Sequence, residues 1–160
     1  MERLHDGEAD LVLTDAFEPQ SDYEYVELTQ IEFVTVLASS VATKLPVDIV
    51  DHDLEDIPQI VVRDSSRHTA RLSKGLLDGT NRWTVNDFAT KKSIIISGSG
   101  WGGMPLHMVR DELAAHSLVR LSPGTHGGVK VPVYLVRERH KPLGPIGSQL
   151  WQMLKDISWP

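Results

Sequence analysis

Short apolar runs alternate with amphipathic segments along most of the 160-residue chain. Runs of β-branched and aromatic residues predict strands, whereas apolar positions that recur every three or four residues predict helices. The predicted strands are residues 9–14, 24–28, 31–38, 59–62, 83–85, 118–121 and 131–136. The predicted helices span residues 64–78, 86–96, 105–115 and 143–157, and a short helix precedes Pro58. This alternation predicts an α/β fold with mainly parallel sheets.

Glycine and proline mark where several of these elements end or begin. Gly7 is expected to end a first helix, and Gly98 to end a helix that Asn86 caps. The run Gly98–Gly103 contains four glycines, which predicts a sharp turn that approaches another group closely. Pro105 suits the first turn of the helix that follows.

Composition and charge exclude several classes of protein. The chain has no cysteine, so disulfides, thiol catalysis and cysteine-bound zinc are excluded together. Its net charge is −6, whereas a surface that grips DNA phosphates is usually basic. We therefore expect that the chain does not bind DNA itself. No apolar run approaches the length of a membrane span, so a membrane is not an expected partner.

Motifs for catalysis or metal binding are missing from the sequence. There is no nucleophile elbow and no phosphate-binding loop. The Gly-x-Gly at residues 98–100 follows a helical pattern rather than a strand, unlike a dinucleotide fingerprint. The seven histidines show no metal-ligand spacing. The sequence therefore predicts no enzyme, no cofactor and no metal.

Three segments, taken in order, resemble parts of one protein family. Residues 98–121, GSGWGGMPLHMVRDELAAHSLVRL, are similar to the turn, helix and strand that precede the end of the effector domain in LysR-type transcriptional regulators. Residues 4–15, LHDGEADLVLTD, resemble a helix-to-strand step of that domain. Residues 131–154 resemble its return strand and final helix. The resemblance covers nearly the whole chain, and the order and spacing of the segments make it fairly specific.

The resemblance implies a two-lobed fold like that of periplasmic binding proteins, with the first lobe incomplete. The first lobe would comprise residues 1–30 and 126–160, and the second lobe residues 39–125. Strands 31–38 and 131–136 would cross between the lobes. The family's winged helix, its linker helix and the first strand, helix and strand of the first lobe have no counterpart before Met1. We therefore expect a C-terminal portion of a regulator with an unpaired strand edge.

The same resemblance implies a cytoplasmic sensor of a small molecule, polar or anionic in character. The effector would favour one arrangement of the lobes, and contacts within a homodimer or tetramer would pass that preference to DNA-binding domains. DNA would be contacted only through an N-terminal domain that this chain lacks. The alternative with the same fold is the solute-binding protein of a transporter. An enzyme on an α/β scaffold is the least supported class.

Helix starts that follow strands suggest where an effector would bind. Ser65, Ser66 and Arg67 follow the strand at residues 59–62 and open a helix. The serines could donate hydrogen bonds to an anion, and Arg67 could pair with a carboxylate. The resemblance supports this interpretation, because the matching turn contacts the effector in many members. Ordinary helix capping, with Arg67 in solvent, is the alternative.

The glycine-rich turn and the first strand provide the remaining candidates. Glycines on both sides of Trp101 predict a ring exposed to the cleft, where it would stack on a planar ligand or close off the pocket. The alternative is a tryptophan that packs over the hinge. Ser99 and Gly100 would supply hydroxyl and backbone contacts. Asp15 follows the strand of the first lobe, and it either contacts the effector or caps a turn.

Overall fold

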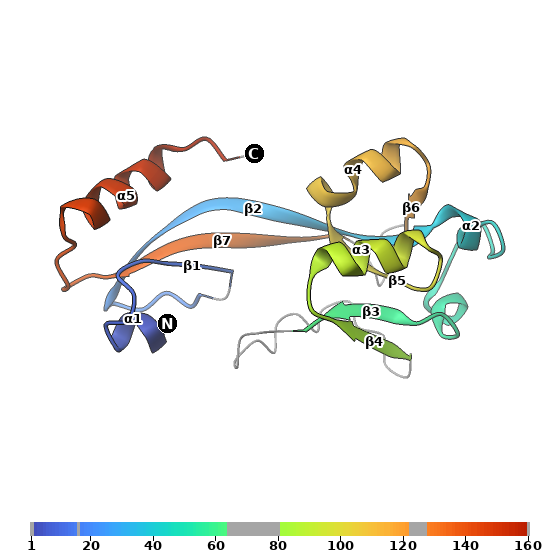
Figure 1. Cartoon of the computed structure of the whole chain (residues 1–160), viewed down its shortest axis with the longest axis horizontal. Coiled ribbons are helices and arrows are strands. Elements are labelled where there is room, and N and C mark those ends of the chain that lie inside the picture. The colour runs from blue at the N-terminus through green and yellow to red at the C-terminus, as the bar shows by residue number, and fades with distance from the viewer. Residues whose placement is uncertain (1, 16, 64–80, 122–127, 160) are drawn as a thin grey trace. The chain divides into compact units, whose positions relative to one another are not determined.

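The computed structural model describes residues 2–15, 17–63, 81–121 and 128–159. The chain divides into two compact units (Figure 1). Unit 1 comprises Met1–Ile31 and Lys130–Pro160, and unit 2 comprises Glu32–Val129. The helix predicted at residues 64–78 lies outside the described residues.

The described elements alternate between helices and strands. The helices are α1 (Glu2–His5), α2 (Ser39–Ala42), the 3-10 helix η1 (Asp51–Leu54), α3 (Phe88–Ile96), α4 (Leu106–Ala114) and α5 (Pro145–Asp156). The strands are β1 (Val12–Thr14), β2 (Tyr23–Ala38), β3 (Gln59–Val62), β4 (Arg82–Val85), β5 (Trp101–Pro105), β6 (Leu118–Arg120) and β7 (Val129–Glu138). The described helices include none that is long and apolar enough to cross a membrane.

Two regions of the chain differ from the predicted elements. The strands predicted at 24–28 and 31–38 form the single strand β2, because the 16 residues from Tyr23 contain no glycine or proline to break it. The turn predicted at Gly98–Gly103 is confined to its first residues, Gly98 and Ser99, whereas residues 101–103 belong to strand β5 and pair antiparallel with β2. Of these glycines only Gly98 has a positive φ, +80°, and it ends α3 as expected.

Helix α3 begins one residue later than the sequence suggested. Asp87 rather than Asn86 is its N-cap, and the Asp87 carboxylate accepts a hydrogen bond from the Thr90 backbone N–H at 2.7 Å. Asn and Asp are about equally good N-cap residues, so the residue type does not decide between Asn86 and Asp87. The position at which the chain leaves β4 decides which of them caps α3. The helices predicted from 105 and over 143–157 are confirmed as α4 and α5 within a few residues.

The sheet of unit 2 is mixed, and the prediction of mainly parallel sheets was wrong. Strand β2 pairs antiparallel with β5 on one side and with β6 on the other. Strand β3 pairs parallel with both β4 and β5. The long strand β2 runs opposite to its two neighbours, because the chain returns from α3 and from α4 in the reverse direction along it.

Alternating side chains of β2 separate two core clusters in unit 2. Val34 and Val36 are fully buried and pack with Ile95 of α3 and Val109 of α4 on one face of the sheet. Leu37 points the other way, into a cluster with the members Leu54, Trp101 and Leu121. A strand buried on both faces shows no polar alternation, which explains the near-continuous apolar run at its end.

Unit 1 contains a smaller core. Strand β1 pairs antiparallel with β7, and no further strand among the described residues pairs with its outer edge. Leu4, Phe17 and Val136 form the buried cluster. Trp151 is the buried residue of α5, whereas Ile146 on the same helix remains 82% exposed.

Candidate functional site

Trp101 is a core residue of unit 2, so the prediction of an exposed ring was wrong. Its side chain is 0% exposed and packs with Leu37, Leu54 and Leu121. The indole N–H donates a hydrogen bond to the Ile57 carbonyl at 3.0 Å. The flanking glycines let the backbone come close to its neighbours instead of exposing the ring. The face that a planar ligand would stack on is therefore already occupied by protein.

Gly100 serves this same close approach. A Cβ at Gly100 would lie 2.5 Å from Ile60 Cδ1 and 2.7 Å from the Pro58 carbonyl oxygen. The next residue, Trp101, donates its backbone N–H to that Pro58 oxygen at 3.1 Å. Only glycine fits at this contact between β5 and β3 without displacing the backbone. Gly100 is buried, so a ligand does not reach it in this structure.

Ser99 is the exposed member of the glycine-rich segment. Its hydroxyl lies 3.0 Å from the Ser97 hydroxyl, and its backbone N–H donates to the Ile94 carbonyl. The two hydroxyls stand at the C-terminal end of α3, where the chain turns at Gly98 into β5. Ser99 is thus held in a defined position with its side chain at the surface.

Asp15 is exposed and directly follows β1 in unit 1. A cluster of aromatic rings begins two residues later: the Phe17 ring lies 4.8 Å from that of Tyr25 and 5.7 Å from that of Tyr134. Tyr25 is 40% exposed, so the cluster reaches the surface. Ser65, Ser66 and Arg67 lie outside the described residues, and their roles stay predictions.

Lys91 is the functional candidate that the sequence reasoning missed. Its side chain is only 6% exposed. It sits on the second turn of α3 with its ammonium 5.9 Å from the centroid of the Phe88 ring. Burial lowers the pKa of Lys91 from 10.5 to about 8, because a low-dielectric surrounding disfavours the charged form. The sequence did contain a sign that Lys91 is buried, because Phe88, Lys91 and Ile95 recur at helical spacing on the buried face of the helix.

The neighbouring Lys92 has an ordinary structural role. Its ammonium lies 2.5 Å from a Glu112 carboxylate oxygen and donates to the Met108 carbonyl at 2.7 Å. These contacts tie α3 to α4. The hydrogen bond from Lys92 lowers the pKa of Glu112 below its ordinary value, and burial opposes this only in part.

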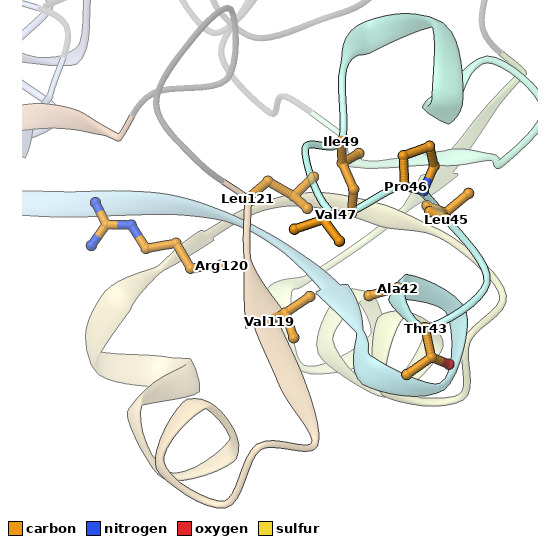
Figure 2. Close-up of a pocket in the computed structure, with 9 residues that line it drawn as sticks. All are labelled: Ala42, Thr43, Leu45, Pro46, Val47, Ile49, Val119, Arg120 and Leu121. Carbon is orange, nitrogen blue, oxygen red and sulfur yellow. The ribbon is translucent and has the colours of Figure 1, made fainter.

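Unit 2 also has a depression of about 320 Å³ (Figure 2). Its walls are Ala42, Thr43, Leu45, Pro46, Val47, Ile49, Val119, Arg120 and Leu121. Figure 2 shows the Arg120 guanidinium directed away from the apolar side chains, and it bonds Glu32 at 3.1 Å. Val47 is fully exposed at the rim. The one charged residue of this lining, Arg120, is thus already paired, and none of the predicted site residues lines the depression.

Comparison with protein-family models matches residues 1–158 to a family described as the LysR substrate binding domain. The chain belongs to this family. The α/β, periplasmic-binding-protein-like fold that the resemblance implied is confirmed. A search of curated protein sequences gave no match.

Solved structures of similar fold are LysR-type regulators. LysG from Corynebacterium glutamicum, solved full-length with bound effector arginine, is 21% identical with a TM-score of 0.75, over 97% of this chain and 53% of LysG. The regulatory domain of HypT from Salmonella typhimurium is 16% identical with a TM-score of 0.76, over 96% and 75%. ArgP from Mycobacterium tuberculosis is 18% identical with a TM-score of 0.74, over 96% and 52%.

This LysR substrate-binding domain thus spans about half the length of the full-length regulators it matches. At such identities the structural likeness shows the fold. LysR substrate-binding domains are the effector-sensing regions of LysR-type regulators, which decides against the alternative of a transporter's solute-binding protein. Domains of this kind are typically not enzymes. Among the described residues, no three His, Asp or Glu side chains gather as metal ligands do.

Proposed function

We propose that this domain senses a small polar or anionic effector for a cytoplasmic LysR-type transcriptional regulator. The family match over residues 1–158 carries the proposal. LysG, which shares the fold, is described with arginine bound as its effector. Amino acids are therefore the first class of effector to test, followed by simple organic acids. We propose no catalytic role and no cofactor.

The effector would act by shifting the populations of two conformations of the regulator. A ligand moves an equilibrium between two conformations only by the difference in its affinity for them, typically 1–3 kcal/mol in coupled systems. A homodimer or tetramer would pass this bias to DNA-binding domains N-terminal to this region. The domain itself carries a net charge of −6, which suits a sensor that does not hold the DNA phosphates.

Five of the predicted residues remain direct candidates for effector contacts, and two take a supporting part. Asp15 and Ser99 are exposed. Ser65, Ser66 and Arg67 are proposed on the sequence alone. Gly100 and Trp101 are buried, so in this proposal they fix the backbone that presents Ser99.

Ligand binding to the purified chain tests the sensing proposal. A molecule that binds the folded state stabilises it by about 2.7 kcal/mol at a hundredfold excess over its dissociation constant. We expect a thermal shift with arginine, another amino acid or an organic acid, confirmed by isothermal titration.

Arg67→Ala should weaken the binding of an anionic ligand by roughly 1.5–3 kcal/mol. Arg110→Ala is the matched control, because Arg110 is an exposed arginine on α4. Unchanged affinity for a carboxylate ligand in both Arg67→Ala and Ser66→Ala would place the site elsewhere.

A DNA-binding measurement on the same chain tests whether it senses the effector without binding DNA itself. We expect no sequence-specific affinity for DNA at physiological salt, as measured by fluorescence anisotropy against the regulatory region of its own gene. Specific binding by the isolated chain would contradict the proposal that it is a sensor only.

A further inference from the structure

Lys91 is a buried charge that has no counter-charge among the described residues of unit 2. Its 6% exposure means that most of the ammonium's hydration is lost on folding. Burying an isolated ammonium is costly, and buried lysines are normally paired. Its surroundings among the described residues include the Phe88 ring, whose centroid lies 5.9 Å from the ammonium, and Gly102, where a Cβ would lie 3.2 Å from Lys91 Nζ.

Two acidic groups of this region, Asp87 at the start of α3 and Glu112 on α4, are already engaged by other residues. Both carboxylate oxygens of Asp87 accept hydrogen bonds from Thr90, at 2.7 and 3.0 Å. Glu112 of α4 pairs with Lys92. No carboxylate among the described residues lies within ion-pair distance of Lys91, although such pairs occur elsewhere in the unit. Within the part of the chain that the structure describes, the buried Lys91 ammonium therefore has no carboxylate partner.

Lys91 is nevertheless not fully enclosed, because 6% of its surface remains exposed to solvent. Lys91 reaches back toward Phe88, the first residue of α3. The Phe88 ring lies 5.9 Å from the ring of Phe33, and both side chains are only partly buried. The Lys91 ammonium and the two aromatic rings thus form a row in which each group lies 5.9 Å from the next.

We propose that the Lys91 ammonium binds the carboxylate of an organic acid whose apolar part lies against the rings of Phe88 and Phe33. The proposal rests on the sensing function and names both a residue and a ligand class for it. The carboxylate would replace the hydration that Lys91 has lost, in a surrounding where a charge-assisted hydrogen bond is strong. The rings would favour an aromatic or branched acid over a small one. The absence of a side chain at Gly102 leaves room for Lys91, because a Cβ there would lie 3.0 Å from Lys91 Cε and 2.8 Å from the Ile60 carbonyl oxygen.

Nuclear magnetic resonance on the whole chain with ¹³C-labelled lysine tests this directly. The Lys91 Cε signal is assigned from its loss in Lys91→Met and is followed during titration with sodium benzoate and with sodium acetate at constant ionic strength. We expect benzoate to shift this signal at lower concentration than acetate. Saturating benzoate should raise the pKa of Lys91 from about 8 toward 10.5. In Lys91→Met, the dissociation constant for benzoate should rise at least ~10-fold, the loss of one charge-assisted bond.

Lys44→Met is the matched control, because it removes the same charge from an exposed position in unit 2. It should leave benzoate binding unchanged. A Lys91 signal that responds to neither acid, or equal benzoate affinity in Lys91→Met and the wild type, would overturn the proposal. Effector binding that depends on Arg67 but leaves the Lys91 signal unmoved would keep the sensing function and discard this site. Amide spectra of Lys91→Met report whether the variant is folded.

Discussion

Replacing Lys91 by methionine should stabilise the free protein at neutral pH. Methionine has a similar unbranched length and fills the same space without a charge. Burial lowers the pKa of Lys91 from 10.5 to about 8. Since one pKa unit corresponds to 1.36 kcal/mol, the buried charge costs the folded state about 3 kcal/mol while the lysine is protonated. Lys91→Met should gain up to this amount in its free energy of unfolding at pH 7.

The pH dependence distinguishes this electrostatic effect from simple repacking. The folded state releases the Lys91 proton near pH 8, whereas the unfolded chain keeps it up to about pH 10.5. In this window the unfolded state binds more protons, so the stability of the wild type rises with pH. Below pH 8 the penalty is present in full. The advantage of Lys91→Met should therefore be largest at pH 7 and should shrink steadily from pH 8 to pH 10.5.

Urea unfolding at pH 7, 8, 9 and 10 measures this difference, with Lys44→Met as the control for the lost charge. Other groups titrate in both proteins and cancel in the comparison. Hydrogen exchange at the amides of α3 reports on unit 2 by itself, in case the two units do not unfold together. A variant less stable than the wild type at pH 7, or a difference that stays constant with pH, would refute the reasoning.

Three further outcomes are expected. Gly100→Ala should destabilise by about 1–3 kcal/mol in urea unfolding, because its Cβ would meet Ile60 and Pro58 O within 2.7 Å; Gly103→Ala, with nothing within 4 Å, should not, and equal losses would contradict this packing. Trp101→Phe should cost about 1–3 kcal/mol, since the indole bond to Ile57 O and part of the packing are lost; a near-neutral result would mean that the ring is not a core element. The lowered pKa of Glu112 makes its stabilisation complete above its ordinary pKa of 4.5 and lost at lower pH. Glu112→Gln should therefore lose less stability than the wild type during acid titration, and parallel acid transitions would refute this role.

The sequence by itself determined the types of most elements and the family. The run at residues 59–62 and the stripe of α5 are local patterns, and a strand or a helix follows from them with little help from the rest of the chain. The segment at residues 98–121 carries the family resemblance in its order of residues, which the match over residues 1–158 confirms. Gly98 as the end of α3 likewise needed only local reasoning, because glycine adopts a positive φ at no steric cost.

Only the tertiary structure decided what the remaining glycines and the two key side chains do. A glycine permits a sharp turn and a close approach equally well, and the partner that chooses between them at Gly100 is Ile60, forty residues away in the chain. The burial of Trp101 depends on Leu54 and Leu121, which no local pattern connects to it. The burial of Lys91 is likewise a property of everything packed around it. Burial and pairing are sums over neighbours that are distant in sequence, so they appear only once the chain has folded.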